Sequence, residues 1–168
     1  AVAPKCNIQC NYCIREFDCV NESRPGVTSK VLSPAEAVRK VREVTEKFSN
    51  IKVIGIAGPG EPLCNEETFI TLALIYKQFP RLDLCLSTNG LLLPKKLDLL
   101  KEVNLQTLTV TVNTVNPEIG ARIYSHVLSP EGRRLKGVNG AERLLKNQLE
   151  GIARAIEAGI VVKINTVM

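Results

Sequence analysis

The chain has 168 residues and a net charge of +5, and this length is typical of one domain. Hydrophobic residues make up 45% and charged residues 23% of it, close to the globular average, which excludes wholesale disorder. No apolar run approaches the ~18 residues of a membrane span, and the first residues lack the regions of a signal peptide. With no Trp, three Tyr and four Phe, the chain has little with which to stack bases. We therefore expect a cytoplasmic domain with neither a membrane nor a nucleic acid as partner.

Apolar, β-rich runs alternate with helical periods along the chain. The expected strands are Ala1 to Lys5, Ile51 to Ala57, Leu82 to Thr88, Thr107 to Asn113 and Ile160 to Val167. Helices are expected to begin at the capping box of Ser33 to Glu36, and near Asn65, Pro94 and Ala141. This alternation predicts an α/β fold with right-handed crossovers and a parallel-stranded sheet. Periodicity leaves open whether that sheet is flat or curls into a partial barrel.

Two further expectations concern the second half of the chain. In the fourth helix the apolar period predicts an inward face of Leu145, Leu149, Ile152 and Ile156. The segment from Val115 to Gly140 is expected to be irregular. The chain opens on Ala1 and stops at Met168 after a strand-like run, so we expect residues 1–168 to be one domain within a longer protein.

Cysteines are concentrated near the start of the chain. Four of the six, Cys6, Cys10, Cys13 and Cys19, fall within 14 residues. Nothing marks the chain as secreted, so metal binding is favoured over disulfides. Three thiolates on one loop can hold a [4Fe–4S] cluster and leave one iron open to a ligand. Four thiolates could instead close a structural zinc site, and that alternative stays open on spacing alone.

The segment CNIQCNYC, with Tyr12 between two cysteines, resembles the CxxxCxφC signature of the radical S-adenosyl-L-methionine (radical SAM) superfamily, in which φ is aromatic. GPGEP, STNG and GIVVKINTV follow in the order of that superfamily's later motifs. The resemblance implies a partial TIM-like (βα)6 radical SAM barrel, truncated here after its fifth strand. It is closer still to the superfamily's maturases of the nitrogenase iron–molybdenum cofactor. These are implied to act as lyase-type enzymes that cleave S-adenosyl-L-methionine (AdoMet) reductively. They are also implied to fuse two further substrate [4Fe–4S] clusters and to insert a methyl-derived carbide.

The resemblance also implies roles for individual residues. Cys6, Cys10 and Cys13 would bind the [4Fe–4S] cluster whose open iron holds AdoMet. Tyr12 would meet the adenine through its backbone, or its ring would shield the cluster from water. Gly60 and Glu61 would receive the methionine ammonium, with an ordinary turn as the alternative.

Polar residues near the carboxyl ends of the expected strands would complete the AdoMet site, because ligands of parallel α/β folds bind there. The expected contacts are Ser87, Asn89, Asn113, Thr114 and Asn165, with Ile164 packing near the adenine. A hydrogen-bond network without a ligand is the alternative for each polar residue.

Two further cysteines would distinguish a maturase from other members of the superfamily. Cys19 and Cys85 would ligate a substrate cluster, although both could be buried thiols. Glu22 and Arg24 are candidate catalytic residues that could hold the methionine carboxylate or relay protons. Arg122, in another motif, could do the same, and surface salt bridges are the alternative for all three. Cys64 is expected to be structural and His126 to be solvated.

Partner expectations follow from the same resemblance. They are cluster-delivery proteins, cofactor carrier proteins and a reductant protein. Arg133, Arg134 and Lys136 form a basic cluster that could dock an acidic carrier or simply be a solvated face. Two other functions stay open: another radical SAM enzyme, such as a molybdopterin-type cyclase or an activating enzyme, and a zinc-stabilised binding module.

Overall fold

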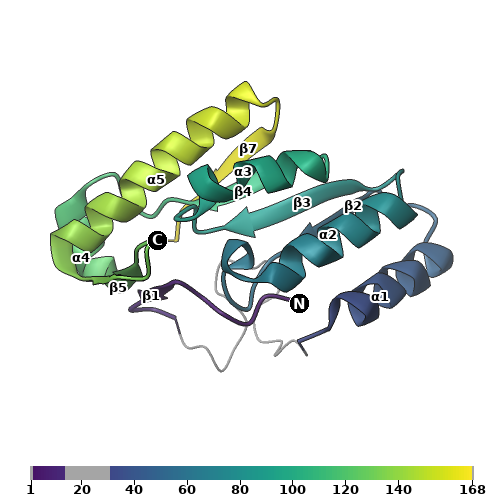
Figure 1. Cartoon of the computed structure of the whole chain (residues 1–168), viewed down its shortest axis with the longest axis horizontal. Coiled ribbons are helices and arrows are strands. Elements are labelled where there is room, and N and C mark those ends of the chain that lie inside the picture. Colours follow the sequence, from purple (N-terminus) through teal and green to yellow (C-terminus); the bar gives the residue numbers. More distant parts are fainter. Residues whose placement is uncertain (1, 14–30, 168) are drawn as a thin grey trace.

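The computed structural model describes residues 2–13 and 31–167. The helices are α1 (Pro34–Lys47), α2 (Glu66–Gln78), α3 (Leu93–Glu102), α4 (Pro117–Ile123) and α5 (Gly137–Glu157), with a 3-10 turn, η1 (Pro62–Cys64). The strands are β1 (Ile8–Cys10), β2 (Val53–Ile56), β3 (Asp83–Thr88), β4 (Thr107–Thr111), β5 (Tyr124–Leu128), β6 (Arg134–Leu135) and β7 (Val161–Asn165). Figure 1 shows their arrangement. None of the helices within these ranges combines the length and apolar character that crossing a bilayer requires.

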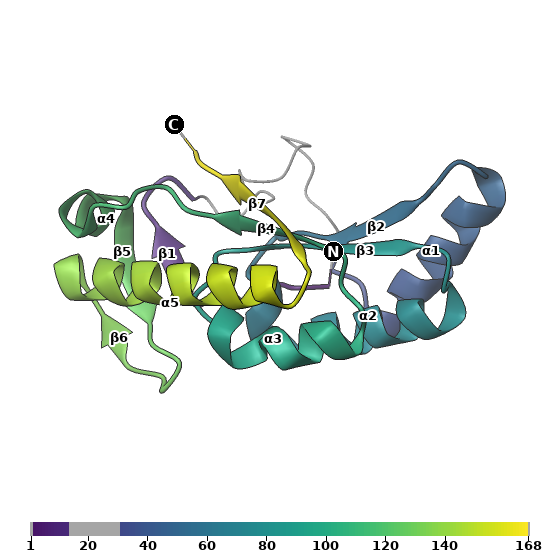
Figure 2. The same cartoon turned by 90° about the horizontal axis from the view of Figure 1, so that it is seen from above.

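A four-stranded parallel sheet forms the centre of the fold, in the order β2-β3-β4-β7. Helices α2, α3 and α5 lie against the same face of it (Figure 2). Leu84 and Leu86 of β3 and Leu108 and Val110 of β4 point to that face and are fully buried. The α/β class and the parallel pairing expected from the sequence are therefore confirmed, and the core lies between sheet and helices.

The opposite face of the sheet carries the residues that alternate with the buried leucines. In β3 these are Cys85 and Ser87, which are half-buried. Ser87 is in register with Thr109 of β4, and Thr109 with Lys163 of β7. Because neighbours in register share a face, this side of the sheet is polar from β3 to β7.

The interpretation of the segment from Val115 to Gly140 as irregular was wrong. It contains α4, β5, β6 and the first turn of α5. Strands β1, β5 and β6 form a second, antiparallel sheet. The expected first strand, Ala1 to Lys5, is also corrected: Ala3 forms only an isolated bridge to Pro59. The true β1 pairs with a strand more than a hundred residues away, which no local pattern can reveal.

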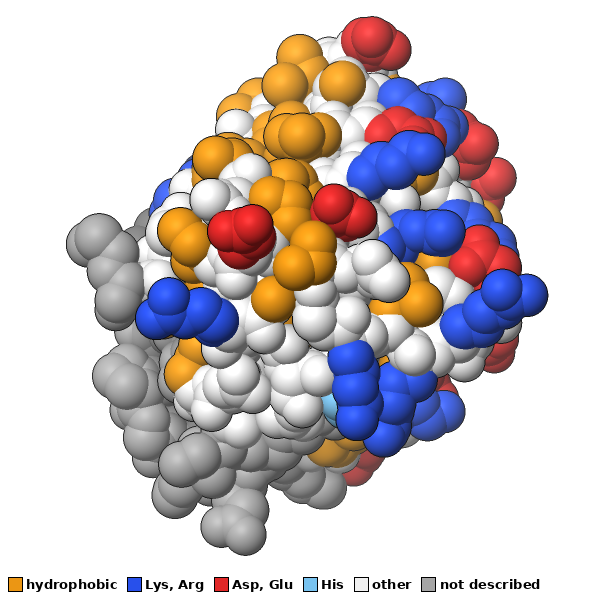
Figure 3. Space-filling view, turned by 90° about the vertical axis from the view of Figure 1, so that its left-hand side faces the viewer, with side chains coloured by type: hydrophobic (Ala, Val, Ile, Leu, Met, Phe, Trp, Pro, Cys, Tyr) orange, Lys and Arg blue, Asp and Glu red, His pale blue; other side chains and the backbone are white. Residues whose placement is uncertain are grey.

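The inward face expected for α5 was wrong at two of its four positions: Ile152 packs against the core and Leu145 is half-buried, but the other two are exposed. Leu149 and Ile156 are 54% and 59% exposed, and on the side where α4 and α5 lie, hydrophobic side chains reach the surface (Figure 3). The buried residues are Gly140, Ala141, Leu144, Gln148, Gly151 and Ala155. Small residues face inward because the helices pack closely: a Cβ on Gly151 would lie 2.7 Å from the Cβ of Leu93.

The two expected helix caps have different outcomes. The capping box of α1 is confirmed, since the Glu36 N–H donates to Ser33 Oγ and the Ser33 N–H to Glu36 Oε2. Asn65 precedes α2 but its side chain makes no cap. Its amide instead accepts from the Lys5 N–H and donates to the carbonyls of Lys5 and Glu61. Asn65 therefore joins the N-terminal segment to the turn after β2.

Candidate functional site

A pocket lies at the carboxyl ends of β2, β3 and β4, where the cysteine segment faces the sheet. Its lining comes from residues 6–13, from the turn after β2 and from the last residues of β3 and β4. The lining residues are Cys6, Ile8, Cys10, Tyr12, Cys13, Ala57, Gly58, Pro59, Gly60, Glu61, Ser87, Thr88, Asn89 and Thr111. The structure thus brings the three cysteines of the CxxxCxφC segment together with the motifs after β2 and β3.

The small antiparallel sheet holds the cysteine segment in place. Cys10 of β1 pairs with Tyr124 of β5, and the Asn11 side chain donates to the carbonyl of Arg122 over 2.7 Å. Gln9 Nε2 donates to the carbonyls of Cys10 and Cys13, over 3.1 and 3.4 Å. These contacts fix the backbone from which two of the thiols project, so the segment expected to be irregular supports the site.

The thiols of Cys6, Cys10 and Cys13 are half-buried at the pocket wall. Within the described ranges, no three His, Cys, Asp or Glu side chains converge tightly enough to hold a single metal ion. A cubane cluster makes a different demand, because each of its thiolates binds a different iron. Three cysteines that line one pocket can each supply a thiolate to a different iron.

The turn after β2 is docked onto the N-terminal segment. The Gly60 N–H donates to the Ala3 carbonyl over 2.7 Å, and the Glu61 N–H to the Lys5 carbonyl over 2.8 Å. A Cβ on Gly60 would lie only 2.3 Å from the Lys5 oxygen. Glycine is required here because the two backbones approach too closely for any side chain.

Glu61 is 2% exposed, and donors of the chain itself surround its carboxylate. Oε1 accepts from the Leu63 N–H and the Thr88 hydroxyl, and Oε2 from the Asn89 N–H, at 2.9, 2.5 and 2.6 Å. Burial raises the pKa of Glu61 to about 7, although these hydrogen bonds act in the opposite direction. The carboxylate therefore braces the pocket wall as well as lining it.

Asn89 connects three parts of the pocket wall. Its side-chain oxygen accepts from the Leu91 N–H, so the amide nitrogen must be the group that faces Asn7 Oδ1, 2.7 Å away. Its backbone N–H meets Glu61. The sequence placed Asn89 in the site but missed Thr88, which strand alternation assigns to the leucine face. Thr88 is the last residue of β3, where its hydroxyl reaches Glu61.

Tyr12 is held by the end of β4. The Asn113 side chain donates to the Tyr12 hydroxyl over 2.8 Å and accepts from the Val167 N–H. Burial, and after it the nearby Cys10, raises the pKa of Tyr12 well above its usual range. The same two causes raise the pKa of Tyr124, a residue the sequence did not indicate, to about 12. Asn113 therefore supports an aromatic group at the cysteine segment and does not itself line the pocket.

Other expected site residues lie outside the pocket wall. The Thr114 hydroxyl accepts from the Asn116 N–H at the start of α4, and Ile164 is 49% exposed on β7. Asn165 ends β7. Cys85 lies two residues before Ser87 on β3. The predictions for Cys19, Glu22 and Arg24 fall outside the described residues.

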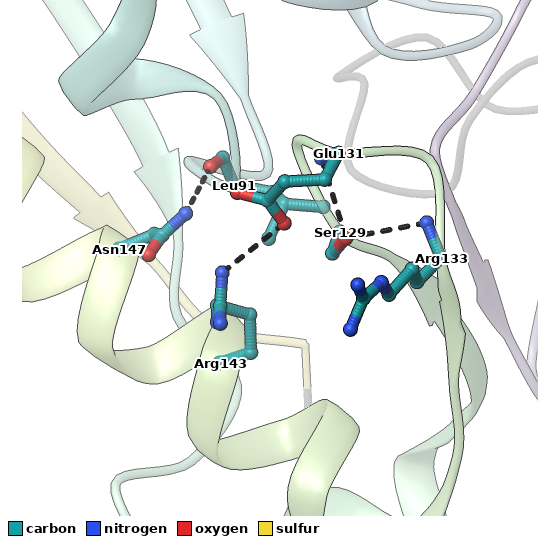
Figure 4. Close-up of polar contacts among 6 residues, drawn as sticks. All are labelled: Leu91, Ser129, Glu131, Arg133, Arg143 and Asn147. Carbon is teal, nitrogen blue, oxygen red and sulfur yellow. Dashed lines mark hydrogen bonds and ion pairs between the residues drawn. The ribbon is translucent and has the colours of Figure 1, made fainter.

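The remaining candidates lie on β5, on and beside β6, and in η1. His126 lies opposite Gln9 in the β1–β5 pairing, and the basic cluster of Arg133, Arg134 and Lys136 is exposed. Glu131, in the turn between β5 and β6, forms an ion pair with Arg143 of α5 at 3.4 Å (Figure 4). Cys64 Sγ donates to the Lys5 carbonyl, which agrees with a structural thiol.

The family model described as the radical SAM superfamily matches residues 1–168. The chain therefore belongs to this superfamily of enzymes. It is 53% identical over 168 residues to the FeMo cofactor biosynthesis protein NifB of Klebsiella pneumoniae, covering 99% of this chain and 36% of that protein. It is 48% identical over 169 residues to NifB of Frankia alni and 46% to that of Azotobacter vinelandii, covering 100% of this chain and 33% of either protein. The chain thus spans about a third of the length of these relatives.

A solved structure of polyhistidine-tagged anSMEcpe with bound AdoMet resembles this fold. The TM-score is 0.60 at 18% identity, over 97% of this chain and 39% of that one. At that identity the likeness shows the shared fold and nothing finer.

Proposed function

We propose that this chain is the radical SAM core of a maturase for the nitrogenase cofactor. Such an enzyme would fuse two substrate [4Fe–4S] clusters, insert a carbide derived from the AdoMet methyl group, and so form the eight-iron precursor. The observation that carries the proposal is the pocket that Cys6, Cys10 and Cys13 share with the GPGE turn and the end of β3. Relatives named as FeMo cofactor biosynthesis protein NifB, 45–53% identical over nearly the whole chain, support a role in the synthesis of that cofactor.

The donor set of the pocket fits a [4Fe–4S] cluster. Three thiols lie at one wall, and the apolar Ile8 and Ala57 also contribute to the lining. Asn7, next to Cys6, is 7% exposed, and its Nδ2 has no acceptor within the described residues. A buried donor without an acceptor is costly, and a sulfur-rich or carboxylate-bearing group beside Cys6 would provide one. When bound, the cluster supplies the electron that cleaves AdoMet into methionine and a 5′-deoxyadenosyl radical.

The part of the pocket formed by the turn after β2 and the end of β3 would bind the methionine end of AdoMet, which carries the charged groups. Ser87 and the turn from Gly58 to Glu61 line the same pocket as the three cysteines. A cationic ligand favours the ionised form of Glu61, so AdoMet and the carboxylate would stabilise each other. Because three internal donors already occupy this carboxylate, we propose that it acts by its charge and by bracing Asn89. Asn113, Thr114, Ile164 and Asn165 would complete the site farther along the sheet.

The finer fold proposal is a partial (βα)6 barrel, with residues 1–168 as its core domain. The polar face of the sheet, with Ser87, Thr109 and Lys163 in one row, supports it, because such a face suits the lumen of a barrel. Cys85 lies on that face and would ligate a substrate cluster together with Cys19. Glu22 and Arg24 would relay protons or hold the methionine carboxylate.

The proposed setting is the cytoplasm, where cluster-delivery, carrier and reductant proteins would serve the enzyme. The exposed Arg133, Arg134 and Lys136 would suit an acidic carrier.

One anaerobic experiment tests the proposed function. The longer protein containing this chain is reconstituted with iron and sulfide, reduced, and supplied with AdoMet and substrate clusters. We expect 5′-deoxyadenosine from radical cleavage and S-adenosylhomocysteine from methyl transfer. Release of 5′-deoxyadenosine alone would indicate another radical SAM reaction, and a colourless protein that retains zinc would indicate a binding module.

A further inference from the structure

Gln148 of α5 is 2% exposed and lies directly behind the pocket wall. Its Nε2 donates to the backbone carbonyls of Asn89 and Thr111, each over 2.8 Å. Both of these residues line the pocket. One amide group therefore joins the two positions at which β3 and β4 leave the sheet, and it does so from a helix that contributes no residue to the pocket lining.

The local packing shows that this contact is built into the fold. Gly90, next to Asn89, has a φ of +81°, and a Cβ there would lie 2.9 Å from Gln148 Cγ. Glycine therefore provides both the backbone conformation and the room that the Gln148 side chain needs. Burying a glutamine is unfavourable unless its polar atoms are bonded, and here the two amide hydrogens have two separate acceptors.

The contact continues from Asn89 to the other side of the pocket. The Asn89 N–H donates to Glu61 and its side chain to Asn7, the neighbour of Cys6. The end of β3 is thus held from behind by α5 and in front by the turn and the cysteine segment. A shift of the Asn89 backbone would therefore move the donors that Asn89 presents to Glu61 and to Asn7.

We propose that Gln148 is a positioning residue that sets the carbonyls of Asn89 and Thr111 for AdoMet binding. This inference rests on the proposed AdoMet pocket. Gln148 acts through Asn89 and Thr111, and binding benefits because the wall is preorganised before the ligand arrives. Removal of the amide takes a donor from both carbonyls, so the ends of β3 and β4 relax away from the arrangement that AdoMet fits.

A matched control lies next to Gln148 on the same helix. Asn147 Nδ2 donates to the Leu91 carbonyl over 2.7 Å, in the same loop but outside the pocket wall (Figure 4). Asn147→Leu thus removes an anchor between helix and loop without touching a lining residue. A role in general stability would be shared by the two positions, whereas a role in positioning would be specific to Gln148.

The test uses the reconstituted full-length protein and AdoMet as the probe. For Gln148→Met we expect AdoMet binding, measured by calorimetry, to weaken about tenfold, which corresponds to ~1.4 kcal/mol. The AdoMet-induced change in the cluster's paramagnetic spectrum should require correspondingly more AdoMet, with an unaltered spectrum at saturation. For Asn147→Leu the binding constant should change less than about twofold. If Gln148→Met does not fold, Gln148→Asn, which retains the amide but shortens its reach, takes its place in the same comparison.

The outcomes separate this inference from the proposed function. Wild-type protein that binds no AdoMet would overturn the proposed function and this inference with it. Wild-type binding together with unchanged binding by the Gln148 variant would overturn the positioning role alone. Equal losses for the variants at 147 and 148 would also overturn it, since they would show general anchoring of the loop.

Discussion

The backbone N–H of Asn89 donates to the Glu61 carboxylate over 2.6 Å. Glu61 belongs to the turn after β2 and Asn89 follows β3, so this bond joins two loops that the sequence presents as separate motifs. The Thr88 hydroxyl reinforces the junction at the other carboxylate oxygen. The GPGE and STNG segments therefore form one wall, in which Glu61 is a structural centre as well as a candidate ligand contact.

The stability of the AdoMet-free protein should depend on pH through Glu61. Its pKa rises from an ordinary 4.5 to about 7 because of burial. The folded state therefore binds a proton more tightly than the unfolded state does, and the protonated form is favoured by folding. This contribution is fully present below about pH 4.5 and is lost as the pH rises through about 7. Urea denaturation at intervals between pH 5 and 8 should show it.

Two glutamine variants test whether Glu61 causes this pH dependence. Glu61→Gln cannot titrate, so it should flatten the decline in unfolding free energy between pH 5 and 7.5. It should also lower stability overall, because its amide NH₂ faces donors of the chain. Glu66→Gln, at an exposed position of α2, should keep the wild-type slope. A wild-type slope that persists in Glu61→Gln would assign the effect to other groups.

Cleavage of AdoMet should depend on Cys10. Cys10→Ala removes one of the three thiols at the pocket wall, and we expect the reduced, reconstituted protein to release no 5′-deoxyadenosine. Cys64→Ala is the matched control, because that thiol contacts the Lys5 carbonyl and does not line the pocket. It should retain release near the wild-type rate. Undiminished release from Cys10→Ala, measured chromatographically, would refute the cluster assignment.

Gln9 should govern how firmly the cysteine segment holds its cluster. Gln9→Ala removes two hydrogen bonds to the carbonyls of Cys10 and Cys13, each worth about 1 kcal/mol. Loss of iron to a chelator, followed by absorbance near 400 nm, should then be several-fold faster. Gln78→Ala, which removes a surface contact to Arg42, should leave that rate unchanged. Equal rates in both variants would show that β1–β5 pairing alone holds the segment.

Local periodicity was enough to predict the four strands of the parallel sheet, β2, β3, β4 and β7. Strand alternation in Leu84, Cys85 and Leu86, and the capping box at Ser33, are determined by residues near in sequence. The pairing of β1 with β5 depends on contacts across more than a hundred residues, and its short strands carry no strong alternation. The support of the cysteine segment was therefore missed.

The errors in α5 and at the pocket wall have a different physical origin. The helical spacing of the apolar residues placed Leu149 and Ile156 inward. The buried residues instead include Ala155 and Gly151, and Gly151 packs closely against Leu93 of α3. Gln148 was missed because a polar residue in an amphipathic helix ordinarily indicates the solvent face. Its burial is explained by the carbonyls of Asn89 and Thr111 at the strand ends, to which its amide donates.

The last prediction concerns Cys85 and Cys19, the residues that would separate a maturase from other radical SAM enzymes. Cys85 shares the polar face of the sheet with Ser87, which lines the pocket, and it lies in register with Thr107 of β4. Cys85 does not itself line that pocket, so a cluster bound there would be a neighbour of the AdoMet site. Methyl transfer requires the acceptor sulfide to come within roughly 3–3.5 Å of the methyl carbon, which such a neighbour could satisfy.

The double variant Cys19→Ala, Cys85→Ala should therefore lower the iron content of the full-length protein by about one [4Fe–4S] cluster. The three-cysteine site should stay filled, so radical cleavage of AdoMet should continue. Methyl transfer and formation of the carbide-bearing precursor should stop, because the acceptor cluster is missing. Cys64→Ala again serves as the control and should keep both iron content and precursor formation. If the double variant retains its iron and still forms the precursor, these two thiols hold no substrate cluster.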